Sequence, residues 1–72
     1  PFCIHLKTLT GRTITCDGVS EDTTVYQVKE IVESKDGVPC WQQSVIHAGR
    51  VLNDHITLGS LNIQPEAVFH LV

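Results

Sequence analysis

Three features are scarce in this chain, and each scarcity disfavours a class of protein. No apolar run approaches the roughly 18 residues that a membrane-spanning helix needs, so no membrane association is expected. The five lysine and arginine residues are scattered and the formal net charge is −3, which disfavours binding to nucleic acid. The three cysteines are odd in number and lack a Cys-x-x-Cys spacing, unlike a secreted disulfide scaffold. Reduced thiols and a cytoplasmic or nuclear location are therefore expected.

The length and composition indicate a small folded domain. The chain has 72 residues, of which 42% are hydrophobic and 18% are charged, a balance typical of a compact soluble protein. A domain of this size buries only about 60% of its unfolded surface, so its core must be efficient. We expect one domain over residues 1–72, and a monomer.

The first twenty residues predict a β-hairpin. Apolar and polar side chains alternate over residues 2–6 and again over 13–19, and a loop containing Gly11 separates the two runs. Gly18 interrupts the second alternation, so Val19 reaches the inner face only if a β-bulge absorbs one residue.

The pattern then changes to that of a helix over residues 25–36. Thr24 and Gln27 have the spacing of a capping box, in which each side chain accepts a hydrogen bond from the other's backbone N–H. Three valines recur at helical spacing inside this range. Gly37 suits the left-handed position that ends a helix, and Pro39 prevents its continuation.

The second half of the chain predicts more strands. Residues 45–52 contain two short apolar runs around Ala48-Gly49, which indicates a strand, a tight turn and a strand. Alternation places Val45 inward and Ile46 outward. Residues 57–61 fit one helical turn, and residues 67–72 fit a final strand. The element order predicts an α+β fold in which one helix packs across a mixed sheet of about five strands.

Several segments resemble the ubiquitin superfamily. The resemblance covers the whole chain with one inserted residue near Gly18, and it implies the β-grasp fold. The matching segments are Lys7-Thr8-Leu9-Thr10-Gly11-Arg12-Thr13-Ile14-Thr15, Val28-Lys29, Gly37-Val38-Pro39, Gln42-Gln43, Ile46-x-Ala48-Gly49, Asn62-Ile63-Gln64 and His70-Leu71-Val72. The same resemblance implies an ion pair between Lys29 and Asp54. It implies a core of Ile4, Leu6, Ile14, Cys16, Val19, Val25, Val28, Val32, Val45, Leu52, Leu58, Ile63, Phe69 and Leu71.

The resemblance also implies a surface for binding other proteins. A contiguous exposed apolar patch usually marks a binding site, and this one would suit an apolar helix or loop of a receptor. The alternative is that these residues are retained from an ancestor without a binding role. The family's recognition patch corresponds here to Leu9, Ile46, His70 and Val72, with Gly49 and Arg50 at its rim.

Two functions fit this resemblance. The first is non-covalent recognition of ubiquitin-binding domains or proteasomal receptors by a ubiquitin-like domain of a longer protein. The second is a conjugatable modifier, or one unit of a tandem modifier, whose Gly-Gly tail lies after Val72. Positions of the commonly used linkage lysines carry Arg12, Arg50 and Pro65, which cannot form isopeptide bonds. Residues 38–43 and 64–69 also resemble an interferon-induced modifier that is built of two ubiquitin-like units. This short similarity is consistent with the chain being one unit of a tandem modifier.

No catalytic, cofactor or metal site is expected from the sequence. Cys3 and His5 share a strand face, but two donors are too few for a metal site. A cysteine nucleophile needs an oriented base in a cleft, which a domain of this size rarely provides. Trp41 is predicted to pack over the helix end, and the alternative is a second, aromatic contact site. Cys40, next to it, is predicted to be exposed.

Overall fold

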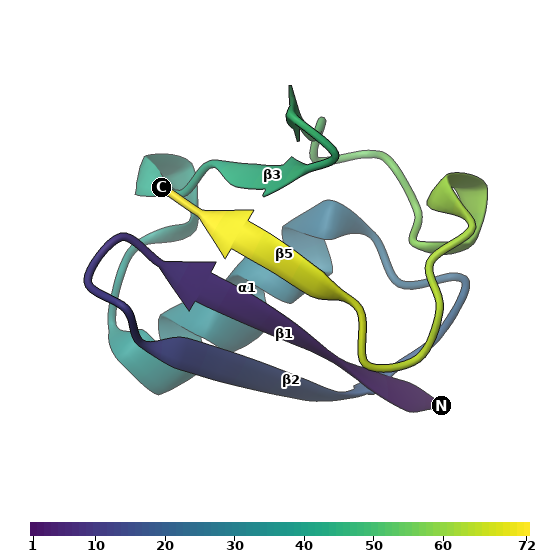
Figure 1. Cartoon of the computed structure of the whole chain (residues 1–72), viewed down its shortest axis with the longest axis horizontal. Helices are drawn as coiled ribbons and strands as arrows, with labels where there is room; N and C mark the ends of the chain where they lie inside the picture. The colour runs from purple at the N-terminus through teal and green to yellow at the C-terminus, as the bar shows by residue number, and fades with distance from the viewer.

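Five strands form one mixed sheet in the order β2-β1-β5-β3-β4 in the computed structural model, which describes residues 1–72 (Figure 1). The two central strands, β1 and β5, run parallel, and the other neighbouring pairs are antiparallel. The elements in chain order are β1 (Phe2–Thr8), β2 (Thr13–Val19), α1 (Val25–Asp36), the 3₁₀ turn η1 (Cys40–Gln42), β3 (Val45–His47), β4 (Arg50–Val51), the 3₁₀ turn η2 (Gly59–Leu61) and β5 (Val68–Leu71). This arrangement confirms the predicted β-grasp fold.

The first hairpin contains the predicted bulge. Phe2 is paired with Val19 and Ile4 with Cys16, so one more residue lies between the two pairs on β2 than on β1. Gly18 takes a φ of 72°, a left-handed conformation that costs a residue without a side chain little. The bulge returns Val19 to the inner face of the sheet, where it is buried.

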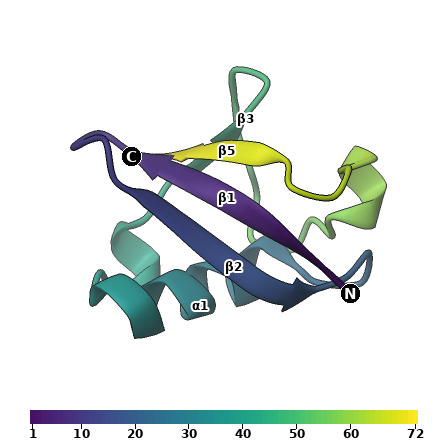
Figure 2. The ribbon, with the colours of Figure 1, turned by 60° about the horizontal axis from the view of Figure 1, so that its bottom comes forward.

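The helix has the predicted bounds and both predicted caps. The backbone N–H of Gln27 donates to Oγ1 of Thr24 at 3.2 Å, and the N–H of Thr24 donates to Oε1 of Gln27 at 2.9 Å. At the other end Gly37 has a φ of 80°, and its N–H donates to the carbonyl of Glu33. Figure 2 shows α1 lying across one face of the sheet, which leaves the opposite face uncovered.

The core fills the space between α1 and the covered face of the sheet. It contains thirteen buried apolar residues, all of them among the fourteen that were predicted. The exception is Ile63, which lies in the loop between η2 and β5 and is only partly buried against the cluster. Burying each of these side chains is worth roughly 1.5–3 kcal/mol before the entropy cost of folding. None of the helices has the length and apolar character that a membrane crossing requires.

The connector after the helix differs from the prediction. Trp41 is 81% exposed, so the prediction that it packs over the helix end is wrong. The buried residue there is Gln43, whose Nε2 donates to the carbonyls of Lys29 at 3.1 Å and Val38 at 2.9 Å. The amide satisfies two backbone acceptors that an indole, with a single N–H, could not both reach. Cys40 is half-buried rather than exposed, with its thiol 3.3 Å from Oε1 of Glu33.

Candidate functional site

Four residues form a continuous line across the uncovered face of the sheet. Lys7 is in register with His70, His70 with Ile46, and Ile46 with Val51, so the line crosses β1, β5, β3 and β4. Directly paired residues point to the same side of a sheet. The sequence neighbours of this central row, such as Val45, point into the core. The row therefore presents two aliphatic side chains beside an imidazole and an ammonium group.

Leu9 and Val72 extend the apolar surface at one end of the strands. Leu9 lies in the loop between β1 and β2 with 81% of its surface exposed, and Val72 follows β5 with 53% exposed. Val72 is held in place by two backbone hydrogen bonds with Ser44, at 2.9 and 3.1 Å. Leu9 and Val72 both line one groove of about 410 Å³, which shows that they lie near each other.

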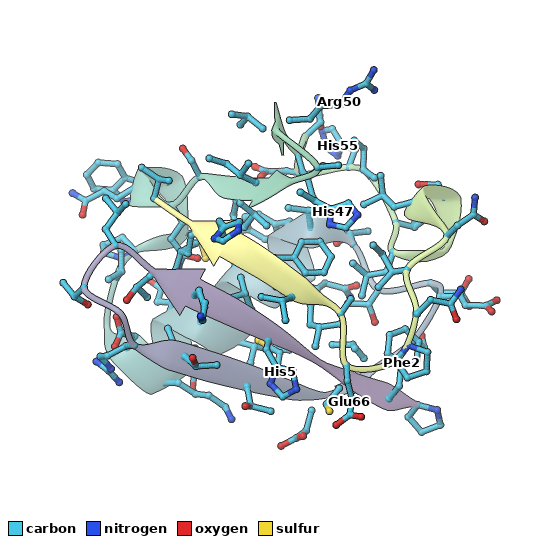
Figure 3. The ribbon with its side chains drawn as sticks, in the orientation of Figure 1. Phe2, His5, His47, Arg50, His55 and Glu66 are labelled. Carbon is cyan, nitrogen blue, oxygen red and sulfur yellow. The ribbon has the colours of Figure 1, made fainter.

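The tight turn between β3 and β4 places the two predicted rim residues. Ala48 and Gly49 have φ values of 53° and 78°, as a two-residue hairpin of the mirror-image type requires. Arg50 opens β4 directly after the turn, is exposed and forms no ion pair. Figure 3 shows its side chain extending away from the body of the molecule.

The two histidines near this face have different roles. The ring of His47 packs on Phe69 with a centroid separation of 4.8 Å, so His47 covers the edge of the core. His70 is exposed and stands in the central row. Alternation along β3 puts His47 on the same face as the buried Val45.

Sequence reasoning missed two members of the central row. Val51 is 69% exposed and stands beside Ile46, and Lys7 stands beside His70. A signal for Val51 was present, because Leu52 was assigned to the core and neighbouring residues of a strand point to opposite faces. Lys7 could be placed only once the parallel pairing of β1 with β5 was known.

Two cysteine thiols have altered acidity, and neither lies in the central row. Burial raises the pKa of Cys16 from 9.0 to about 11. Partial burial and then the carboxylate of Glu33 raise the pKa of Cys40. A catalytic cysteine needs a lowered pKa, because the thiolate is the nucleophile. These two thiols therefore lack the activation that nucleophilic catalysis requires.

The fold and the uncovered face define a ubiquitin-like protein, a class of module that is generally non-enzymatic. The model of the ubiquitin family matches residues 4–72, and the chain belongs to that family.

The chain matches small ubiquitin-like proteins over most of their length and a much longer ligase over a small part of its length. The NEDD8-like protein RUB1 of Saccharomyces cerevisiae is 35% identical over 69 residues, which are 96% of this chain and 88% of that protein. Ubiquitin-like protein 1 of Schizosaccharomyces pombe is 39% identical over 69 residues, 96% of this chain and 87% of that protein. The E3 ubiquitin-protein ligase parkin of Rattus norvegicus is 37% identical over 54 residues, 75% of this chain but only 12% of the ligase. The chain therefore spans a small part of one relative and most of the others.

Proposed function

We propose that this chain is a non-covalent recognition module that binds proteins of the ubiquitin–proteasome pathway through the uncovered face of its sheet. The binding surface consists of Leu9, Ile46, His70 and Val72, with Gly49 and Arg50 at its rim. The observation that carries the proposal is the direct pairing of Ile46 with His70 on the face that α1 leaves open. The proposal assigns the chain no catalytic role and treats it as a monomer of the cytoplasm or nucleus.

The chemistry of the surface defines the kind of partner. Exposed aliphatic side chains that gather on one face gain free energy when a partner removes them from water. An amphipathic helix of a receptor supplies such an apolar strip at every third or fourth residue. Lys7 ends the row on β1, and Arg50 lies next to its other end at the β3–β4 turn, so acidic residues beside the strip would improve the match and speed association. The expected partner is a helix with an apolar strip and acidic edges.

An NMR titration tests the proposal. The isotope-labelled chain is titrated separately with a ubiquitin-interacting helix and with a proteasomal ubiquitin receptor. Shifts should cluster on Leu9, Ile46, Gly49, His70 and Val72, and Ile46→Ala should weaken binding by about tenfold through lost apolar contact.

A matched control for Ile46→Ala is Tyr26→Ala, which removes an exposed large side chain from the helix instead. This variant should bind as the unchanged chain does. The proposal fails if the shifts cluster on α1, or if Ile46→Ala binds normally while its spectrum shows an intact fold.

A second function is supported by the NEDD8-like and ubiquitin-like proteins among the relatives. RUB1 and ubiquitin-like protein 1 are matched over 88% and 87% of their own lengths. The alternative is a conjugatable modifier, or one unit of a tandem modifier, with a Gly-Gly tail after Val72. Mass spectrometry of the full gene product in cells separates the two functions. Isopeptide-linked adducts that end in Gly-Gly favour the modifier, and their absence together with patch-dependent binding favours the recognition module.

A further inference from the structure

Three potential metal ligands meet on the uncovered face, around the first half of β1 and outside the central row. Cys3, His5 and Glu66 each offer one ligand atom, and these three atoms all lie within 4.8 Å of one another. Figure 3 shows the side chains of His5 and Glu66 next to each other beside β1. The sequence placed only Cys3 and His5 together. Glu66 was missed because it reaches them from the turn before β5.

No hydrogen bond or ion pair among the three side chains accounts for their proximity. Neither the thiol of Cys3 nor the carboxylate of Glu66 takes part in a side-chain hydrogen bond or an ion pair. Nδ1 of His5 lies 3.0 Å from the hydroxyl of Thr15, its partner on β2. An imidazole whose Nδ1 is held in this way has Nε2 free to bind a cation, and such an outer hydrogen bond is the usual support of a metal-binding histidine.

The backbone holds the third donor against the first two. The N–H of Glu66 donates to the carbonyl of Cys3 at 2.8 Å, and the N–H of His5 donates to the carbonyl of Ala67 at 2.9 Å. These bonds join the turn before β5 to β1 at the level of the cluster. Because these backbone bonds belong to the folded chain, they bring the turn that carries Glu66 to β1 before any cation arrives.

We propose that Cys3, His5 and Glu66 form a Zn²⁺ site. A thiolate, an imidazole and a carboxylate are the donors that Zn²⁺ takes in proteins, and three protein ligands with an open fourth position form a common zinc arrangement. Zinc–ligand bonds of about 2.0–2.3 Å in tetrahedral geometry place neighbouring donors about 3.4–3.6 Å apart. Glu66 is exposed and has several rotatable bonds, so its rotation closes the remaining gap. Cys3 binds as thiolate and its proton passes to solvent, and water takes the fourth position.

The first measurement is the affinity for Zn²⁺, determined with the purified chain in competition with a chromophoric chelator. One equivalent should bind, and Cys3→Ser, His5→Gln and Glu66→Gln should each lower the affinity about tenfold or more. Thr15→Val keeps every ligand and removes the hydrogen bond to His5, so it should cause a smaller loss. Circular dichroism establishes that each variant is folded. Glu66 is exposed, so Glu66→Gln should remain folded. Its affinity for Zn²⁺ therefore decides the test even if another variant is not folded.

Matched controls use the same residue types elsewhere in the chain. Cys40→Ser, His55→Gln and Glu21→Gln should leave the affinity unchanged. Co²⁺ supplies a second readout, because a cysteine thiolate bound to it gives a charge-transfer absorption band. That band should persist in Cys40→Ser and disappear in Cys3→Ser.

The proposal is overturned if Zn²⁺ does not bind at a large molar excess, or if Cys3→Ser and Cys40→Ser bind it equally well. Both measurements use the chain without any protein partner. They therefore succeed or fail independently of the proposed recognition function.

Discussion

Nζ of Lys29 lies 2.6 Å from Oδ1 of Asp54, and this ion pair joins the middle of α1 to the turn after β4. The side chain of Lys29 is only 10% exposed, whereas that of Asp54 is 44% exposed. The same turn also receives a backbone hydrogen bond from Tyr26 to the carbonyl of Asp54. The pair was implied by the family resemblance, and the structure confirms it.

The burial difference predicts unequal effects of removing the two partners. Asp54→Ala leaves the largely buried side chain of Lys29 without its carboxylate and should lower the free energy of unfolding by about 1–2 kcal/mol. Lys29→Met removes the charge and keeps an apolar side chain of similar length, so it should cost less than about 1 kcal/mol. Urea unfolding of both variants measures the two costs. Equal losses of unfolding free energy would show that the burial of Lys29 does not determine the cost of breaking the ion pair.

Gln43 should be more important for stability than its polar character suggests. Its Nε2 satisfies the carbonyls of Lys29 and Val38, and Gln43→Ala leaves both without that donor and opens a space in the connector. We expect a loss of about 1–3 kcal/mol in urea unfolding.

The control for Gln43→Ala is Trp41→Ser in the same connector. Because the indole is 81% exposed, this change should stay within about 0.5 kcal/mol. A larger loss of unfolding free energy from Trp41→Ser than from Gln43→Ala would show that Trp41, and not Gln43, stabilises the connector.

The elements that the sequence predicted well are those whose signal is local. The capping box of Thr24 and Gln27, the left-handed position at Gly37 and the bulge at Gly18 each depend on a few neighbouring residues. The core residues were implied by the family resemblance, and the one that differs, Ile63, lies in a loop and is only partly buried.

The parts that the sequence did not predict depend on contacts between distant residues. Trp41 and Gln43 lie in a short connector, and only the positions of the carbonyls of Lys29 and Val38 decide which of them is buried. Glu66 joins Cys3 and His5 across more than sixty residues of sequence through the pairing of β1 with the segment around β5. The four residues of the family's patch were named from the resemblance and stay a prediction, whereas placing Lys7 and Val51 on the same face required the strand register.

Cys16 should make the stability of the fold sensitive to alkaline pH. Burial raises its pKa from 9.0 to about 11, so the unfolded chain loses the thiol proton at a lower pH than the folded chain does. The stability from the neutral buried thiol is complete below about pH 9 and is lost as the pH rises to about 11, by roughly 2–3 kcal/mol. Unfolding in urea across this pH range should show the decline.

The matched variant for this pH dependence is Cys16→Val, which keeps an apolar side chain in the core and cannot ionise. The difference between the two stability profiles isolates the contribution of the thiol from that of every other group of the chain. Parallel profiles would contradict the assignment of the alkaline loss to Cys16.

Val51 should contribute to partner binding although it was not among the residues predicted from the sequence. It is 69% exposed and stands directly beside Ile46 in the central row. Val51→Thr replaces a methyl group by a hydroxyl group and keeps the branched shape, so the fold should be unaffected while affinity falls about fivefold through lost apolar contact. Val68→Thr is the matched control, because Val68 is an exposed valine of β5 outside the central row and should leave affinity unchanged. Titration of both variants with the receptor helix measures the difference, and equal losses would show that binding is not centred on the row that Ile46 and His70 define.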